Sequence, residues 1–305
     1  MKIILSGGSG LVGSALTRAF RLEGHEVMHL VRPGRPLSRG EIRWDPLSAQ
    51  ADSAQLEDAG AVVHLSGANV SEGRWTEARK QVLRSSRVDT TRVLVDALAR
   101  LRHPPQVFVC ASAVGYYGNR GDELLTESSQ AGENFLALLA RDWEAEANRA
   151  QQGGIRTVML RFGAILAGQG GALPQMVLPF RLGLGGRLGA GTQWLSWIAL
   201  EDVVSVVRFV LDNPIVRGPV NTVAPSPVRN AEFTRILGRV LRRPAVIPVP
   251  AFVMRLALGE MADALLLASQ RAIPEKLRQA NYAFKFPDLE TTLRFLLRSS
   301  QDSQN

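Results

Sequence analysis

Short apolar runs alternate with longer amphipathic stretches along the first half of the chain. The runs are rich in Val and Ile, carry apolar residues on both faces and lie at 2–7, 26–31, 61–67, 106–112 and 156–163. The stretches with a helical pattern lie between them, at 11–22, 75–101 and 133–151. Strands that are apolar on both faces are typical of a parallel sheet covered by helices. The alternation therefore predicts an α/β fold with right-handed crossovers and a doubly wound parallel sheet.

The pattern changes after residue 163. Two glycine-rich segments, 166–176 and 181–193, are interleaved with Leu, Phe, Met and Trp, which predicts ordered loops over a site rather than flexible linkers. A helix at 201–212 and a strand at 218–224 return to the sheet, and a small, mainly helical C-terminal lobe follows. The predicted units are a dinucleotide-binding domain (1–163 plus 201–224), a substrate lobe (164–200 plus 225–299) and a frayed tail (300–305).

A glycine motif joins the first predicted strand to the first predicted helix. Gly7, Gly10 and Gly13 form G-x-x-G-x-x-G in the segment GGSGLVG. Such glycines permit a tight turn, let the backbone approach a pyrophosphate, and let helix and strand pack closely. The phosphates then lie on the amides of the helix N-terminus. We therefore predict a Rossmann-type dinucleotide site, whose first turn also includes Ser9, Leu11 and Val12.

The second predicted strand indicates which dinucleotide binds. An acidic residue at its end would hold the ribose 2′-hydroxyl of NAD, but this strand ends in Arg32. Arginine can pair with a 2′-phosphate and stack on adenine. We predict NADP(H) in preference to NAD(H), with Arg32 as the selecting residue and with Ser9 and Arg35 as assisting groups. The alternative is that Arg32 is only a solvated loop charge.

Composition narrows the class of protein further. Of 305 residues 46% are hydrophobic, the net charge is +8, and almost all positive charge is arginine. The charges form no long block, so we predict a small-molecule substrate and neither nucleic acid nor membrane as a partner. The single cysteine, Cys110, excludes an internal disulfide. No segment resembles a signal peptide or a membrane span, so we expect a cytoplasmic protein.

Several longer segments carry a resemblance to a known family. They are VVHLSGANV, RWTEARKQVLRSSRVDTTRVLVDAL, ASAVGYYG, LRFGAIL, GLGGRLGAGTQWLSWIALEDV and GPVNTVAPSPVRNAEF. The chain resembles the extended, epimerase-like short-chain dehydrogenases/reductases. It is most similar to an atypical group, the NAD-dependent epimerase family proteins that end in a domain of unknown function. The resemblance extends to about residue 297.

The resemblance implies a catalytic set that this chain carries only in part. Extended reductases use a Tyr as general acid, and a Lys four residues later lowers the pKa of that Tyr. A Ser or Thr at a strand end donates to the substrate oxygen, and a helix Asn completes a proton path. Ser112 matches the strand-end position. The tyrosine position is Phe135, the lysine position is Leu139, and the asparagine aligns with Arg87. Ordinary tyrosine-based hydride chemistry is therefore not expected.

Other residues can be placed around the expected cleft. Tyr116 and Tyr117 follow Ser112 in a glycine-rich loop, where one is expected to line the site and the other to pack; Tyr117 is the candidate that could touch substrate. The strand end 65–68 is expected to line the cofactor through Leu65, Ser66, Gly67 and Ala68. The resemblance adds Phe162, Gly163 and Ile165 on the nicotinamide side.

Four further side chains are expected to have structural roles. We expect His64 to be a hydrogen-bonded strand histidine, Arg161 an ion-pair partner, Asp202 a helix cap and Cys110 a buried inert thiol. The histidines show no metal-ligand spacing.

Two hypotheses about function stay open. One is an NADP(H)-dependent oxidoreductase or epimerase-like enzyme of atypical mechanism, and the other is a non-catalytic NADP(H)-binding redox sensor or scaffold. The stretch 75–101 could pair in a homodimer or only cover the sheet.

Overall fold

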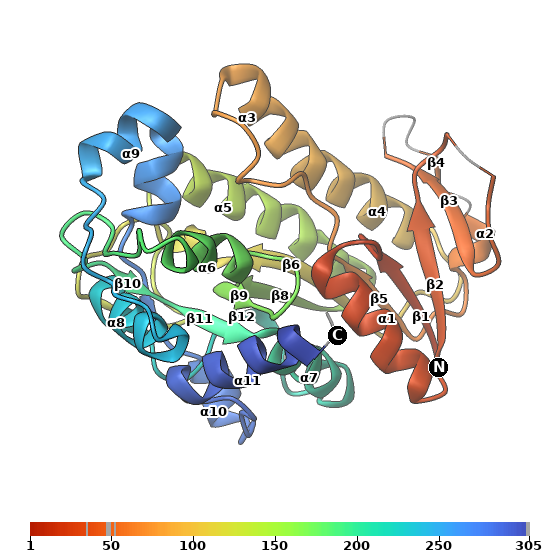
Figure 1. The fold of residues 1–305 in the computed structure, drawn as a ribbon. Coiled ribbons are helices and arrows are strands. Elements are labelled where there is room, and N and C mark those ends of the chain that lie inside the picture. Colours follow the sequence, from red (N-terminus) through yellow and green to blue (C-terminus); the bar gives the residue numbers. More distant parts are fainter. Residues whose placement is uncertain (35, 47–49, 52, 303–305) are drawn as a thin grey trace.

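A computed structural model describes residues 1–34, 36–46, 50–51 and 53–302. Its centre is a sheet with the order β12-β8-β6-β5-β1-β2-β3-β4, in which seven strands run parallel and β4 pairs antiparallel to β3 (Figure 1). The strands are β1 Lys2–Ser6, β2 Glu26–Val31, β3 Glu41–Asp45, β4 Gln50–Ala51, β5 Ala61–His64, β6 Val107–Ala113, β8 Arg156–Phe162 and β12 Gly218–Thr222. The doubly wound parallel sheet predicted from the sequence is confirmed.

Helices connect these strands and build the C-terminal lobe. They are α1 Leu11–Leu22, α2 Ser53–Leu56, α3 Glu77–Arg84, α4 Thr90–Leu98, α5 Phe135–Asn148, α6 Leu173–Arg181, α7 Leu200–Asp212, α8 Asn230–Leu241, α9 Ala251–Leu258, α10 Glu275–Gln279 and α11 Leu289–Asp302. Three short ribbons tie the lobe together: β7 Leu124–Leu125 with β14 Arg271–Ala272, β9 Ala164–Leu166 with β11 Trp197–Ala199, and β10 Trp194–Leu195 with β13 Val228–Arg229.

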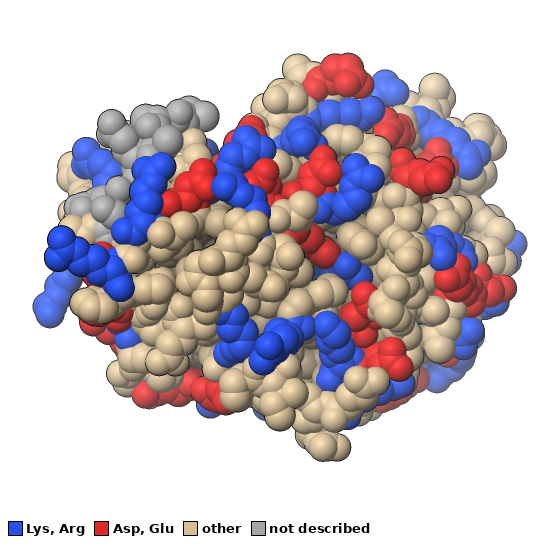
Figure 2. All heavy atoms as spheres, turned by 180° about the vertical axis from the view of Figure 1, so that it is seen from behind, with Lys and Arg blue, Asp and Glu red and all other residues tan. Residues whose placement is uncertain are grey.

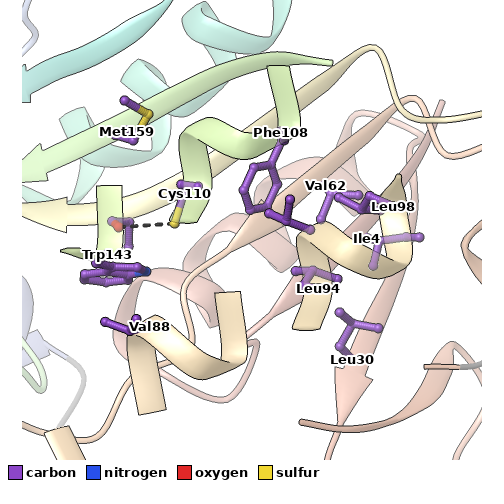
Figure 3. Close-up of a cluster of buried hydrophobic side chains, with 14 of the residues drawn as sticks. Ile4, Leu30, Val62, Val88, Leu94, Leu98, Phe108, Cys110, Trp143 and Met159 are labelled. Carbon is purple, nitrogen blue, oxygen red and sulfur yellow. Dashed lines mark hydrogen bonds between the residues drawn. The ribbon is translucent and has the colours of Figure 1, made fainter. Parts of the chain in front are cut away.

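The two faces of the sheet are covered by different helices. Leu16 and Phe20 of α1 pack with the valines of α7 on one face, against Ile3 and Leu5. On the other face α4 and α5 pack over Phe108 and neighbouring residues (Figure 3). Burial of both faces explains why these strands read as continuous apolar runs.

Cys110 lies inside the second of these layers. Its thiol is fully buried, near Trp143 and Met159, and donates to the carbonyl of Ala111 (3.4 Å, Figure 3). Burial raises the pKa of the Cys110 thiol far above its ordinary value. The expectation of a buried, inert cysteine is confirmed.

The predicted helix 75–101 is interrupted. The chain forms α3, then a π-helical turn at Ser85–Asp89, then α4. The buried residues Leu83 and Val88 stand five positions apart, wider than the usual three or four of an α-helix, and this extra residue is accommodated by the π-helical turn. Turns of this kind occur often at functional sites. The first predicted loop, 166–176, is also partly helical, because its last four residues belong to α6, Leu173–Arg181.

Asp202 joins the C-terminal lobe to α7. The sequence predicted a helix cap, and that prediction is wrong: the cap position is Ala199, and Asp202 lies inside the first turn. Its two carboxylate oxygens accept from the amides of Lys285 (2.8 Å) and Phe286 (2.9 Å). The residue is structural as expected, but it anchors a segment more than eighty positions away.

The surface mixes both signs of charge. On the face seen in Figure 2, Lys and Arg lie interspersed with Asp and Glu around an uncharged area. Among the described helices there is none with the length and apolarity that a membrane crossing needs. The predicted tail 300–305 begins within α11, which runs to Asp302; residues 303–305 lie outside the described part of the chain.

Candidate functional site

The carboxyl ends of the parallel strands form the edge where a ligand is expected. In open α/β sheets ligands bind beyond this edge, at the point where the strand order reverses. Here the reversal lies between β1, which leads to the glycine turn, and β5, whose register sets Ser6 beside His64. The predicted cofactor residues follow β1, β2, β5 and β8, so the fold brings their segments to one edge.

The glycine turn after β1 has no room for side chains. Gly7 has φ +73°, and a Cβ there would lie 2.9 Å from the backbone of Leu65. A Cβ on Gly13 would lie 2.2 Å from the carbonyl oxygen of Gly7. The first glycine is therefore needed for the turn and its contact with β5, and the last for packing α1 against the turn.

Helix α1 begins at this turn without a side-chain cap. Its N-cap residue is Gly10, so no side chain caps the first amides, which have no acceptor inside a helix. Ser9 and Gly10 are exposed, and Leu11 and Val12 are half-buried. Free amides at the positive end of a helix dipole form an anion site, as a pyrophosphate requires.

The glycine-rich segment 166–176 lies against the start of α1. The sequence did not predict this contact. Cβ atoms built at Gly170 and Gly171 would lie 3.4 and 2.8 Å from the side chain of Leu11. Both glycines have positive φ, at +72° and +68°. The glycine content of 166–176 indicated an ordered loop, but only the fold shows that this loop reaches the phosphate end of the edge.

The strand β2 is followed by Arg32, at the position where an acidic residue would select NAD. Arg32 follows β2 directly and its side chain is exposed. Arg35, which was expected to assist, lies outside the described residues. An exposed guanidinium at this strand end can donate to a 2′-phosphate.

The end of β5 is held by the π-helical turn Ser85–Asp89. The Ala68 amide donates to the Ser86 hydroxyl (3.0 Å), and the Arg87 guanidinium donates to the Ala68 carbonyl (2.9 Å). Gly67 is exposed, and Leu65 and Ser66 are half-buried. The predicted cofactor-lining segment therefore lies at the edge, supported from behind by two polar side chains.

On the β8 side the structure gives Gly163 a packing role. A Cβ there would lie 2.6 Å from the carbonyl oxygen of Ser196 and 2.9 Å from Val223. Phe162 and Ile165 are half-buried, and the β9 strand that contains Ile165 pairs with β11. These residues lie at the expected end of the edge, and close strand packing accounts for the glycine.

Ser112 and Tyr117 belong to one buried polar network rather than to an open cleft. Ser112 is 3% exposed and its hydroxyl donates to Glu144 (2.6 Å). Tyr117 is fully buried and its hydroxyl lies 2.6 Å from Asn221 Oδ1 and 2.9 Å from the Thr126 carbonyl. Burial raises the pKa of Tyr117 to about 12. The structure does not support the catalytic roles predicted for these two hydroxyls, because both are occupied inside the protein.

Arg161 is the centre of that network. Its Nε and Nη2 donate to the two carboxylate oxygens of Glu144 (2.8 and 2.7 Å), and its Nη1 donates to Tyr117 (2.9 Å). The guanidinium also lies 3.5 Å from the ring centre of Tyr116. The predicted ion-pair role of Arg161 is confirmed, and Glu144 is the partner. The position of Glu144 on the core-facing side of α5 was the sequence signal for a buried carboxylate.

The helix that carries the catalytic tyrosine in extended reductases is apolar at its start. Phe135 is the first residue of α5 and packs edge-on against Trp75, with Lys80 5.4 Å from its ring centre. Leu139 is buried in the core. Lys80 is itself paired with Glu260 (2.6 Å). The fold thus brings a lysine near this position, but from another helix and already in an ion pair.

His64 is structural, as expected. It is fully buried at the end of β5, with Nδ1 2.6 Å from the Ser6 hydroxyl. Burial lowers the pKa of His64 to about 3, so the ring is neutral at physiological pH. Within the described part of the chain, no group of three or more His, Cys, Asp and Glu side chains is placed to hold a metal ion.

These features define an α/β protein with a helical C-terminal region and with a glycine cradle at the switch point, as in dinucleotide-binding proteins. The chain belongs to the NAD dependent epimerase/dehydratase family, whose match covers residues 3–222, and a domain of unknown function, DUF1731, matches residues 249–296. The family resemblance seen in the sequence is confirmed.

Known proteins are similar over nearly the whole chain. Epimerase family protein Mb2239 of Mycobacterium bovis is 45% identical over 282 residues, or 92% of this chain and 93% of that protein. Epimerase family protein SDR39U1 of Mus musculus is 37% identical over 96% of this chain and 99% of its own length. The crystal structure of human SDR39U1 with NADPH superposes with a TM-score of 0.88 at 34% identity, covering 98% and 99% of the two chains.

Proposed function

We propose that this protein is an NADP(H)-dependent oxidoreductase of atypical mechanism that acts on a small carbonyl or sugar-like substrate. The observation that carries the proposal is the glycine cradle, in which Gly7 and Gly13 exclude side chains in front of the uncapped start of α1. The cradle fits a pyrophosphate, and Arg32 stands where a 2′-phosphate would lie. The human relative crystallised with NADPH supports the same choice of cofactor.

In this proposal the protein acts by binding and orienting the cofactor and the substrate. It does not relay protons through a Tyr–Lys pair. The cofactor, when bound, supplies or accepts a hydride. Ser9, Leu11 and Val12 would hold its phosphates through the turn, and the segments at 65–68 and 162–165 would line the part of the site that takes the nicotinamide. Of the two phenols at this edge, Tyr116 is the half-buried one, and no described residue bonds its hydroxyl, so it is the phenol available to exchange a proton.

The choice of cofactor is tested by titrating NADPH and NADH into the wild-type protein and into Arg32→Ala, following nicotinamide fluorescence. We expect NADPH to bind more tightly than NADH to the wild type. The variant should lose about tenfold in NADPH affinity, the value of a charged hydrogen bond of about 1.5 kcal/mol, with no change for NADH. Tighter binding of NADH to the wild type would contradict the assignment.

Turnover is tested separately, by anaerobic NADPH consumption against a library of carbonyl compounds and enones. Tyr116→Phe should slow any reaction found, and Ser112→Ala should change it little because that hydroxyl is occupied by Glu144. The second candidate function is an NADP(H)-binding redox sensor without catalysis, favoured by the apolar start of α5 at Phe135. Micromolar NADPH binding without turnover of any compound would favour the sensor.

A further inference from the structure

Arg87 presents a cation that the described protein does not neutralise. It lies in the π-helical turn Ser85–Asp89 and is partly buried. Burial and the nearby charge of Arg79 lower the pKa of Arg87 to about 10, which still leaves it protonated at neutral pH. Within the described residues no carboxylate lies in ion-pair range of its guanidinium, and its acceptors are the Leu83 carbonyl (3.1 Å), the Ala68 carbonyl (2.9 Å) and the Ser86 hydroxyl (3.4 Å).

Neutral acceptors satisfy hydrogen bonds but not charge. A partly desolvated cation without a counter-ion is unfavourable, and a bound anion offsets that cost. The Trp143 ring, 5.4 Å from the Arg87 guanidinium carbon, offsets only part of it. By the bonds described, Nε and one hydrogen of Nη2 have no protein acceptor, so the guanidinium can still receive one carboxylate.

The guanidinium adjoins the expected cofactor edge. A Cβ built at Gly67 would lie 3.1 Å from Cζ of Arg87, and 3.3 and 3.4 Å from its Nη2 and Nε. Gly67 is exposed and belongs to the segment predicted to line the cofactor. A side chain at position 67 would therefore crowd the guanidinium from the side of this segment.

The neighbouring charges set the charge of the ligand. Arg79 is paired with Glu72 (3.3 Å) and donates to the Asn69 carbonyl, so its charge has a counter-ion, whereas the charge of Arg87 has none among the described residues. One uncompensated positive charge then remains at the turn, which matches a single carboxylate better than a phosphate dianion. The planar guanidinium fork matches carboxylate geometry as well.

We propose that Arg87 is the anion-binding residue of the substrate site, and that the substrate is a small carbonyl compound bearing a carboxylate. This inference rests on the proposed function for the role of the site, but it concerns a separate ligand contact. A carboxylate held at Arg87 would fix a substrate by one end while its carbonyl lies along the strand-end edge toward the nicotinamide. The residue would select among substrates by charge.

The test uses the whole chain saturated with NADP⁺ and measures binding of pyruvate and of pyruvamide by calorimetry. Pyruvate is a carbonyl compound with one carboxylate, and pyruvamide has nearly the same shape without the charge. We expect pyruvate to bind at least tenfold more tightly than pyruvamide, and Arg87→Gln to abolish that difference. Arg84→Gln is the matched control, because Arg84 precedes Arg87 by one helical turn, carries the same charge and is paired with Asp142; it should keep the preference.

Three outcomes would overturn the inference. They are equal binding of pyruvate and pyruvamide to the wild type, equal losses in Arg87→Gln and Arg84→Gln, and a loss of NADP⁺ affinity in Arg87→Gln large enough to account for the lost anion binding. The last result would assign Arg87 to the cofactor. Because NADPH titration is read independently, failure of cofactor binding would refute the proposed function, whereas failure of pyruvate binding on a cofactor-loaded protein would refute only the role of Arg87. Gly67→Ala provides a second variant, which keeps the positive charge of Arg87 but places a methyl group against its guanidinium.

Discussion

Arg161 and Arg87 are both arginines withdrawn from solvent near the same edge of the sheet, and their surroundings differ in one respect. Arg161 is 2% exposed and makes a two-point ion pair with Glu144. Burial alone would lower its pKa, but the hydrogen bonds and charge of Glu144 outweigh burial and raise it. Among the described residues, the hydrogen-bond partners of Arg87 are carbonyl and hydroxyl oxygens, and its pKa is lowered.

The difference separates a structural cation from an available one. Arg161 uses its fork on Glu144 and Tyr117 and thereby joins α5, β8 and the loop after β6. Arg87 holds Ala68 at the end of β5 and keeps part of its fork free. Burial alone therefore does not show what a buried arginine does; the presence or absence of a carboxylate partner does.

The largest effect is expected from breaking the Arg161 pair. Glu144→Gln leaves Arg161 charged and buried without its counter-ion and also disturbs the acceptor of Ser112. We expect a loss of about 3–5 kcal/mol in the free energy of unfolding, measured by urea denaturation. Asp142→Asn, on the same helix but in a more exposed pair with Arg84, should cost about 1 kcal/mol or less. Equal losses in the two variants would remove the distinction between the buried and the exposed pair.

A pH titration extends the comparison to a buried base that carries no charge. The pKa of His64 is lowered by burial to about 3, while in the unfolded chain it is about 6.5. As pH falls below 6.5 the unfolded chain gains a proton that the folded one refuses, so stability falls until about pH 3. We expect His64 to account for about 3 kcal/mol of the loss between pH 7 and pH 4.

The measurement is urea unfolding at pH 7, 5.5 and 4 for the wild type and for His64→Gln. Gln keeps a polar group near the Ser6 hydroxyl but does not titrate. The difference between the two pH profiles isolates the histidine from the acidic groups. Parallel profiles would show that His64 is not held neutral by the fold.

The smallest effect on stability is expected at Arg87. Arg87→Gln removes hydrogen bonds to two carbonyls but also removes a desolvated charge, so the two changes oppose each other. We expect a change of about 1 kcal/mol or less in the free energy of unfolding, measured in the same urea series. A loss as large as that of Glu144→Gln would make Arg87 a structural residue like Arg161.

The sequence predicted the parallel core strands well because each is a continuous apolar run buried on both faces. It missed β3 and β4, and Glu41–Asp45 shows why: this strand lies near the sheet margin, and its alternating, partly exposed pattern has two charged ends. The glycine turn was readable because Gly7 and Gly13 obey a local steric requirement.

The catalytic side chains were harder to predict. Ser112 matched a family position, but whether its hydroxyl faces a ligand or Glu144 depends on α5, which packs across the strand end from 32 residues further along. In the same way, the Tyr117 hydroxyl donates to Asn221, which lies 104 residues further along the chain. Sequence patterns give the position of a residue on its own element, and they do not give the partner that a distant element places against it.

The return of β12 to the sheet has a consequence for how this protein is made. During synthesis β8 is complete at Phe162, but its neighbour β12 ends at Thr222, about 60 residues later. At ribosomal rates of about 5–20 residues per second, the open edge of β8 waits for roughly 3–12 s. An unpaired edge strand is a template for pairing with another chain. A nascent chain paused in this interval would carry Arg161 and Tyr117 without Asn221, and this is the stage at which we expect chaperones to be needed most.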